Sequence, residues 1–363
     1  MAKLKVGLIF GGKSGEHEVS LTSAFSIYNA LNKKKYDIKL IGIDKNGVWH
    51  TGGAKELWIN PGKTEITQLN TKTPEITAVS KKGKVHLIDL GSGKNLTDID
   101  VFFPIAHGTF GEDGCLQGFL ELLGAAYVGP GVLGSAVGMD KDVMKKLFRD
   151  AGLSIGKFHT LLAGEKYDPA KIIKDLKFPI FVKPANLGSS VGVSKARNRK
   201  ELDEAIKTAF RYDTKVVLEE NLKGREIECS VLGNEKPIAS VPGEIRLQSD
   251  FYSYDAKYIS PDAATPVPRA ELSQKMIREV QAAAVKVFKV LNCEGMGRVD
   301  FFLTPKGLYV NEINTLPGFT SISMYPKMLQ ESGIPYPKLL DKLIRLALER
   351  KKRSDRLKRD FKP

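Results

Sequence analysis

Two short segments in the last third of the chain carry the side chains with the clearest chemistry. Arg298 and Asp300 lie two residues apart, and Glu312 and Asn314 repeat that spacing further on. Both segments are predicted strands, and because side chains alternate across a strand, each pair lies on one face. If the strands form a hairpin, two carboxylates and an amide oxygen converge, which are ligands that Mg²⁺ accepts together with phosphates. The spacing alone leaves open a second interpretation, an outward polar face of a hairpin.

A segment rich in glycine and serine, residues 183–192, follows another predicted strand. Backbone N–H groups of such a loop hold oxyanions and Lys183 adds a positive charge, so the segment is typical of a phosphate-covering loop. An ordinary hairpin turn stays an alternative. Further on lies an extended acidic linker, which suits an adenine edge and ribose hydroxyls or is simply solvated. Its candidate residues are Glu219, Glu220, Leu222 and Glu226.

Single residues in three loops add further candidates. The N–H of Gly318, just after the predicted hairpin, suits an oxyanion donor, because glycine allows a ligand to approach the backbone closely. Glu16 precedes the first predicted helix, where a carboxylate either binds a substrate ammonium or stabilises the helix N-terminus. His107 stands in a glycine-rich loop and is either a ligand-binding or a structural histidine.

Two longer patterns bear on nucleotide binding. Residues 247–268 have no clear period, which is typical of an active-site lid, and contain Lys257 and Tyr258, otherwise surface residues. The sequence from Gly7 to Ser14 matches the P-loop pattern G-x-x-x-x-G-K-[ST]. Gly7 is followed by apolar residues and lies inside a predicted strand, so a kinase of the P-loop class is the weaker alternative.

Composition leaves two partner classes open. The 363 residues carry a net charge of +14, which fits nucleic-acid binding or a field that attracts an anionic substrate such as ATP. The charge is densest from Arg350 onward, where a solvated tail is expected. Cys115, Cys229 and Cys293 form no C-x-x-C motif, which argues against disulfides or zinc and favours a reducing cytoplasm. No apolar stretch approaches the ~18 residues of a membrane span.

The order of predicted elements indicates a mixture of α/β and α+β units. Strand 4–10, the helix after it and strand 38–43 predict a parallel sheet. Residues 46–82 are expected to form a surface insertion with one hairpin. Later strands are short and alternate with helices, and the last unit holds the metal-site candidates, the lid and the basic tail. The predicted units are 1–134, 135–225 and 226–363.

Six motifs occur in an order that resembles the D-alanine–D-alanine ligases of the ATP-grasp superfamily. They are GGKSGEHEVS (11–20), HGTFGEDGCLQG (107–118), KPANLGSSVGV (183–193), YDAKY (254–258), GRVDF (297–301) and NEINTLPGFTS (311–321). The resemblance covers nearly the whole chain except residues 46–82 and the basic tail. It implies an ATP-grasp fold of three domains, in which an N-terminal parallel α/β domain precedes two α+β lobes that enclose ATP.

The resemblance also implies roles for individual residues. The implied ATP-binding set is Lys141, Lys183, Ser189, Ser190, Glu219, Glu220, Leu222, Glu226, Lys257 and Asn311. Two Mg²⁺ or Mn²⁺ ions would be held by Asp300, Glu312 and Asn314. The substrate amino acids would be contacted by Glu16, His107, Ser323 and Met324. The implied catalytic set is Glu16, Ser189, Tyr258, Arg298 and Gly318, with Arg298 and the Gly318 N–H forming an oxyanion hole.

The implied reaction joins two D-alanines at the expense of ATP, through a D-alanyl phosphate, to make D-alanyl-D-alanine for peptidoglycan precursors. Tyr258 favours D-alanine as acceptor, whereas Met324 replaces an aliphatic residue and leaves D-serine and D-lactate as alternatives. The resemblance further implies a cytoplasmic homodimer with no membrane or nucleic-acid partner. A basic nucleic-acid-binding protein remains the alternative of another class.

Overall fold

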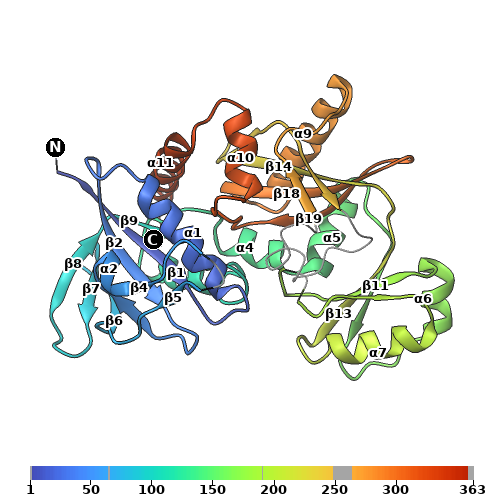
Figure 1. The fold of residues 1–363 in the computed structure, drawn as a ribbon, viewed down its shortest axis with the longest axis horizontal. Coiled ribbons are helices and arrows are strands. Elements are labelled where there is room, and N and C mark those ends of the chain that lie inside the picture. The colour runs from blue at the N-terminus through green and yellow to red at the C-terminus, as the bar shows by residue number, and fades with distance from the viewer. Residues whose placement is uncertain (1, 64–65, 190, 248–263, 359–363) are drawn as a thin grey trace.

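The computed structural model describes residues 2–63, 66–189, 191–247 and 264–358, and all structural statements concern these residues. The molecule is elongated, with three sheet-containing bodies along its long axis (Figure 1). The N-terminal sheet lies at one end and the central sheet at the other. The C-terminal sheet, although last in the chain, lies between them. The predicted fold class, an α/β unit followed by two α+β units, is confirmed.

The N-terminal sheet has the strand order β3-β2-β1-β9. Its elements are β1 (Leu4–Gly11), α1 (His17–Ala30), β2 (Tyr36–Ile43), β3 (Trp49–Thr51) and β9 (Val101–Pro104), followed by α3 (Cys115–Leu122). Strand β1 pairs in parallel with β2 on one side and with β9 on the other. The loops that follow β1 and β9 therefore meet at the carboxyl edge of the sheet, the switch point where open α/β sheets bind ligands.

The expectation that residues 46–82 form a surface insertion with one hairpin is wrong in part. A hairpin does begin there, but several short elements fold back on the sheet: α2 (Ala54–Leu57), β4 (Trp58–Ile59), β5 (Gln68–Leu69), β6 (Ile76–Lys81), β7 (Lys84–Asp89) and β8 (Asn95–Ile99). Trp58 is buried and its ring stacks 4.9 Å from the ring of Phe10. Helix α2 and strand β4 each bury a single side chain, so no hydrophobic period marks them in the sequence, whereas β6 and β7 each bury two alternate side chains.

The central sheet is antiparallel, with the order β10-β13-β11-β12. Its elements are β10 (Phe158–Leu162), α6 (Pro169–Leu176), β11 (Ile180–Pro184), β12 (Ser194–Ala196), α7 (Arg199–Ala209) and β13 (Lys215–Glu220). The helices α4 (Val132–Met139) and α5 (Lys141–Asp150) precede it. Helix α4 had no counterpart in the sequence-based prediction.

The C-terminal sheet has the order β17-β16-β14-β18-β19, with β15 paired to β14. Its strands are β14 (Arg225–Gly233), β15 (Ile238–Ala239), β16 (Gly243–Leu247), β17 (Ala264–Val267), β18 (Gly295–Thr304) and β19 (Gly307–Asn314). The helices of this part are α9 (Gln274–Val290), α10 (Met324–Glu331) and α11 (Tyr336–Ser354).

Buried clusters join parts of the chain that are distant in sequence. Met144 and Phe148 of α5 lie in one apolar cluster with Phe288 of α9 and Val299 of β18, so α5 packs on the C-terminal sheet. Residue 134 lies inside α4. The domain limits predicted at 134/135 and 225/226 stay predictions.

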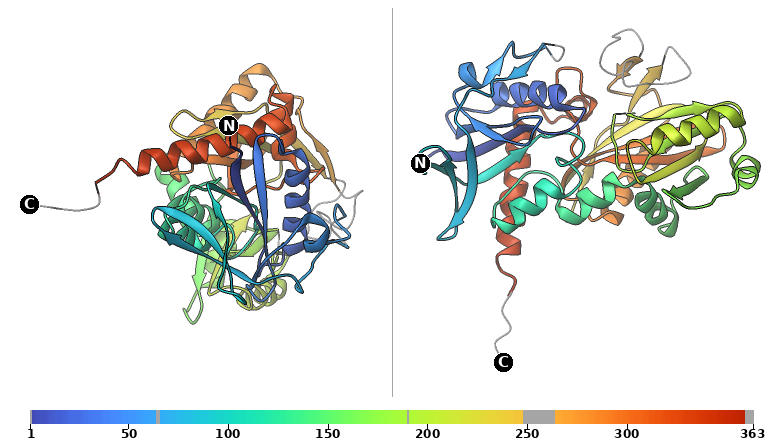
Figure 2. Two further views of the ribbon diagram at one scale, coloured as in Figure 1. Left: turned by 90° about the vertical axis from the view of Figure 1, so that its left-hand side faces the viewer. Right: turned by 90° about the horizontal axis from the view of Figure 1, so that it is seen from below.

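The basic end of the chain is only partly the solvated tail that was expected. Up to Ser354 it is the last turn of α11, which runs between the N-terminal unit and the C-terminal sheet (Figure 2). Arg350 donates a hydrogen bond to the carbonyl oxygen of Tyr127 at 2.9 Å, and Arg353 pairs with Glu235 and Glu294. Over the described residues, no helix has the length and apolarity needed to cross a membrane.

Candidate active site

The predicted hairpin of acidic side chains is present. Strands β18 and β19 pair with Asp300 opposite Glu312 and with Arg298 opposite Asn314. Residues directly opposite in an antiparallel pair share a face, so the four side chains converge as expected. The side chains of Arg298, Asp300 and Glu312 are 19%, 16% and 31% exposed, too little for a solvated hairpin face. The structure therefore favours an enclosed polar site over the alternative.

Arg298 is fixed at the centre of this face. Its Nε and Nη2 each donate to one carboxylate oxygen of Asp300 at 2.7 Å, and its Nε lies 3.3 Å from Glu228 Oε1. Burial alone would lower the pKa of Arg298, but the carboxylates of Asp300, Glu228 and Glu312 hold that pKa well above its usual value. The guanidinium is a permanent cation in a set orientation, which suits a group that meets developing negative charge.

Two lysines, Lys145, which is buried, and Lys183, which is largely buried, share the carboxylate of Glu219 next to this hairpin. Lys183 Nζ lies 3.0 Å from Glu219 Oε2 and Lys145 Nζ lies 3.3 Å from Oε1. Lys145 also donates to the carbonyl oxygen of Asn311 at 3.3 Å. Burial raises the pKa of Glu219, but the two ammonium groups more than offset it and lower that pKa to about 2. For Lys145 burial outweighs Glu219, and its pKa is lowered.

Lys145 was missed from the sequence, although a signal was present. It lies four residues after Lys141 on α5, so both ammonium groups are on one helix face. Lys141 Nζ donates to the carbonyl oxygen of Leu187 at 2.6 Å and lies 4.0 Å from Glu312 Oε2. The predicted phosphate ligand Lys141 thus bridges the glycine- and serine-rich loop and the acidic hairpin.

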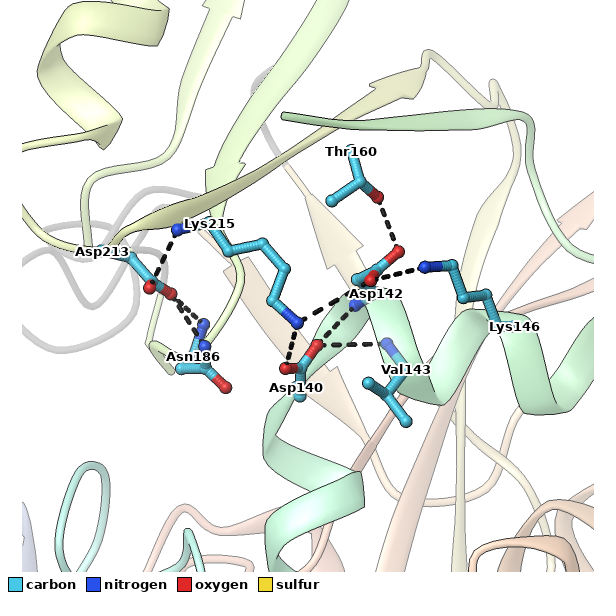
Figure 3. Close-up of polar contacts among 8 residues, drawn as sticks. All are labelled: Asp140, Asp142, Val143, Lys146, Thr160, Asn186, Asp213 and Lys215. Atoms are coloured by element: carbon cyan, nitrogen blue, oxygen red, sulfur yellow. Dashed lines mark hydrogen bonds and ion pairs between the residues drawn. The ribbon is translucent and has the colours of Figure 1, made fainter. Parts of the chain in front are cut away.

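An ion-pair network anchors the start of α5 to the central sheet (Figure 3). Lys215 Nζ on β13 lies 2.5 Å from Asp140 Oδ2 and 3.7 Å from Asp142 Oδ2. Asp140 caps α5 by accepting the N–H groups of Asp142 and Val143. Nearby, the N–H of Asn186 donates to Asp213 at 2.7 Å. The network fixes both the helix that carries Lys141 and the first residues of the glycine- and serine-rich loop.

The linker residues lie where β13 turns into β14. Glu220 accepts the N–H of Lys157 at 2.7 Å, and a Cβ on Gly156 would stand 3.1 Å from Leu222. Burial lowers the pKa of Lys183, but the carboxylates of Glu219, Glu312 and Glu226 together hold that pKa above its usual value. Of the predicted adenine and ribose residues, Glu219 is therefore part of the lysine cluster and Glu226 acts on Lys183, while Glu220 and Leu222 contact residues 156–157.

Glu16 connects the N-terminal unit to the central lobe. Ser189 of the glycine- and serine-rich loop donates a hydrogen bond to Glu16 Oε1. A Cβ on Gly108 or on Gly188 would lie 3.0 Å from Glu16 Oε2, so both loops approach the carboxylate because they carry glycine there. Burial, together with the charge of Glu16, raises the pKa of neighbouring Glu112 to about 8. Glu112 accepts the N–H of Gly108 at 2.6 Å.

His107 uses both ring nitrogens inside the protein. Nδ1 lies 3.0 Å from the carbonyl oxygen of Leu316 and Nε2 lies 3.1 Å from Ser23 Oγ. The side chain is buried, and this burial lowers its pKa to about 4, so the ring is neutral near pH 7. Both ring nitrogens thus have protein partners in this structure, and the expected contact between His107 and substrate stays a prediction. Ser23 was not identified from the sequence.

The loop after β19 holds the remaining candidates. Ser323 Oγ accepts the N–H of Thr320 at 3.0 Å, and a Cβ on Gly318 would stand 2.8 Å from that oxygen. The predicted substrate residue Met324 is buried in a small apolar cluster with Ile245. The candidates Ser190, Lys257 and Tyr258, and most of the predicted lid, lie outside the described residues.

The predicted metal ligands fit a divalent cation in chemical type. In the part of the chain that the structure describes, no group of three or more His, Cys, Asp or Glu side chains is arranged around a common metal position. Asp300 and Glu312 with the amide of Asn314 form a smaller set of hard oxygen donors on one face. Such a set is what Mg²⁺ uses when phosphates and water complete its shell.

Comparison with known proteins agrees with this geometry. Family models for the N-terminus and the C-terminus of D-ala D-ala ligase match residues 5–130 and 147–345. A D-alanine--D-alanine ligase of Oceanobacillus iheyensis is 49% identical over 361 residues, which is 98% of each chain. The chain therefore belongs to the D-alanine–D-alanine ligase family.

Solved structures show the same likeness. The VanG D-Ala:D-Ser ligase from Enterococcus faecalis has a TM-score of 0.84 and 38% identity, covering 95% of this chain and 100% of that one. The D-alanine--D-alanine ligase from Bacillus anthracis complexed with ATP has a TM-score of 0.73 and 30% identity, covering 98% of this chain and 100% of that one.

Proposed function

We propose that this protein ligates two D-alanines to D-alanyl-D-alanine while ATP is converted to ADP and phosphate, as a step in making peptidoglycan precursors. The observation that carries the proposal is the hydrogen bond between Ser189 and Glu16. It joins the loop that suits phosphate to the carboxylate that suits a substrate ammonium, so the two half-sites form one site. A phosphoryl group and an amino acid bound there are neighbours, as ligation through an acyl phosphate requires.

ATP is assigned to the lysine cluster and the linker beside it. Lys141 and Lys183 are the proposed phosphate ligands, with Ser189, Ser190, Lys257 and Asn311 around the phosphates. The adenine and ribose ligands are proposed to be Glu219, Glu220, Leu222 and Glu226. Two Mg²⁺ or Mn²⁺ ions bound by Asp300, Glu312 and Asn314 would offset phosphate charge.

In the first step the carboxylate of one D-alanine attacks the γ-phosphorus, ADP leaves, and a D-alanyl phosphate forms. Glu16 holds the ammonium of this D-alanine, and Lys141 and Lys183 balance the charge of the transferred group. In the second step the amine of the other D-alanine attacks the acyl carbon and displaces inorganic phosphate, which takes up the proton that the amine loses. Arg298 and the Gly318 N–H stabilise the oxyanion of the tetrahedral intermediate.

D-Alanine is the proposed acceptor, and D-serine and D-lactate are the alternatives. D-Serine has support from the 38% identity to a D-Ala:D-Ser ligase. We assign the acceptor site to Ser323 and Met324 with Tyr258. The test incubates the protein with ATP, Mg²⁺ and D-alanine, then measures phosphate release and the product mass. The dipeptide mass is expected. If phosphate is released only when D-serine or D-lactate is added, that compound is the acceptor. If no phosphate is released with D-alanine, D-serine or D-lactate, ligase activity is excluded.

A homodimer is the proposed assembly. Leu122 on α3 is 89% exposed, and Val132 and Leu133 on α4 are 41% and 58% exposed. Because α3 and α4 contact one another, these side chains form a candidate apolar contact surface. Light scattering tests this assembly: the wild type is expected to be a dimer and Leu122→Glu a monomer. A wild-type monomer would exclude the assembly.

We keep the cytoplasm as the proposed location, because Cys229 and Cys293 are buried free thiols.

Nucleic-acid binding loses support but keeps a direct test. The basic residues Arg350 and Arg353 are engaged inside the protein by Tyr127, Glu235 and Glu294, which leaves less positive charge available to phosphates. Retention on DNA-cellulose at low salt by the whole protein, lost when residues 355–363 are deleted, would restore this function.

A further inference from the structure

Helix α1 carries a row of serines that hydrogen-bond to the loops around the proposed site. Ser20, Ser23 and Ser26 recur at a spacing of three, which places them along one side of the helix. Ser20 Oγ accepts the N–H of Gly11 at 2.7 Å and donates to the carbonyl oxygen of Ile105 at 2.6 Å. Ser20 thus ties together the ends of β1 and β9.

The second serine begins a chain of hydrogen bonds whose direction is determined. The carbonyl oxygen of Leu316 can only accept, so Nδ1 of His107 carries the proton and Nε2 of the neutral ring accepts. Ser23 therefore donates to Nε2, at 3.1 Å, while its oxygen accepts the N–H of Phe319 at 3.2 Å. Every donor in this buried chain has an acceptor.

These hydrogen bonds hold the backbone on both sides of Gly318. The carbonyl oxygen of Leu316 and the N–H of Phe319 are fixed by His107 and Ser23. The carbonyl oxygen of Phe319 accepts from Tyr336 Oη at 3.3 Å, and that hydroxyl is 3.0 Å from Ser26 Oγ. Within residues 315–319, Gly318 is the one residue that is not buried. Its peptide is therefore the accessible part of a loop that is otherwise clamped.

We propose that Ser23 and His107 are positioning residues that hold the Gly318 N–H in place as an oxyanion donor. The inference rests on the proposed function, because it assigns these side chains to the loop that stabilises the tetrahedral intermediate. Neither side chain touches substrate in this account. Their effect is to keep a donor at the point where negative charge develops.

The proposal predicts a particular kinetic effect. Ser23→Ala leaves the Phe319 N–H and the His107 Nε2 without their partner, so the loop shifts toward other donors and acceptors. Removal of an oxyanion donor costs about 10²–10³ in turnover, and a displaced donor costs less. We expect kcat to fall about 10- to 100-fold. The KM for ATP should stay within about twofold of the wild-type value, since these hydrogen bonds do not reach the lysine cluster.

Five proteins are compared: the wild type, Ser23→Ala, His107→Ala, His107→Asn and Thr22→Ala. Thr22 is the matched control, because it is also a hydroxyl on α1 but donates only to Glu18 of the same helix, at 3.1 Å. His107→Asn keeps an amide donor near the position of Nδ1 and should retain more activity than His107→Ala. The measurements are kcat, the KM for ATP and for D-alanine, the thermal midpoint, and inhibition by a phosphinate analogue of the tetrahedral intermediate.

The outcomes distinguish a failure of the positioning role of Ser23 and His107 from a failure of the proposed ligase activity. We expect Ser23→Ala and His107→Ala to bind the phosphinate at least about tenfold more weakly while the KM for D-alanine changes little, because only the intermediate meets the oxyanion donor. Wild-type kcat and phosphinate inhibition in both variants would overturn the proposal, and so would parallel losses in phosphinate affinity and both KM values. If Ser23→Ala does not fold, the two His107 variants decide. An inactive wild type would refute the proposed function instead.

Discussion

The buried ammonium of Lys145 gives a quantitative test of the lysine cluster. Its side chain is 3% exposed and shares Glu219 with Lys183. Removing one partner of a buried pair costs about 3–5 kcal/mol when the other charge is left uncompensated. In Lys145→Met, Glu219 keeps Lys183 at 3.0 Å, so we expect about half that cost, about 2 kcal/mol. For a unit of ~150–250 residues this lowers the thermal midpoint by about 4–8 °C.

The neighbouring Lys146 provides a matched control on the same helix. Its side chain is 52% exposed and pairs with Asp142 four residues away, an arrangement worth less than about 1 kcal/mol. Lys146→Met should therefore unfold near the wild-type temperature. Both variants are followed by calorimetry, with the KM for ATP measured alongside and expected to rise only in Lys145→Met. Equal midpoints for Lys145→Met and Lys146→Met, with an unchanged KM for ATP, would show that Lys145 neither stabilises the fold nor supports ATP binding.

Three further predictions concern charge and its position. Arg298→Lys should lower kcat about 100-fold or more while the Kd for ATP, measured by calorimetry, stays near wild type, because lysine cannot reproduce the paired contact with Asp300; normal turnover would remove Arg298 from the oxyanion hole. The pKa of His107 falls from 6.5 to about 4 on folding, so the unfolded chain binds one proton more than the folded protein between these pH values. The stability that His107 contributes is complete above pH 6.5, and about 3 kcal/mol of it is lost as the pH falls to 4. The thermal midpoint of His107→Asn should therefore change less between pH 7 and 5 than that of the wild type, whereas parallel curves would contradict the lowered pKa of His107. Lys215→Met should raise the KM for ATP about five- to tenfold, equivalent to about 1–1.4 kcal/mol, through the loosened start of α5; an unchanged KM would show that the network is not needed for ATP binding.

The sequence predicted the parts of the site that have a short-range pattern. The spacing of Arg298 with Asp300 and of Glu312 with Asn314 is a property of two adjacent strands, and the structure pairs them as expected. Strand β1, helix α1 and strand β2 of the N-terminal unit were predicted for the same reason, because their periods lie within a few residues, whereas most of the short elements between β3 and β9 were not.

What the sequence did not predict depends on contacts between distant segments. His107 could be a ligand or a structural residue until the fold brought Ser23 and Leu316 to its two nitrogens. Lys145 is one lysine among many until burial beside Glu219 distinguishes it. Trp58 belongs to the core through its stacking on Phe10, and no local period marks such a tertiary contact.

The D-alanyl phosphate intermediate is tested by following the oxygen that leaves the first D-alanine. D-Alanine labelled with oxygen-18 in its carboxylate is incubated with the protein, ATP and Mg²⁺, and the inorganic phosphate is analysed by mass spectrometry. Ligation through a D-alanyl phosphate transfers one labelled oxygen to phosphate in each turnover, with formation of labelled D-alanyl-D-alanine. Phosphate released without label would contradict the account, because the carboxylate would then not have been the phosphoryl acceptor.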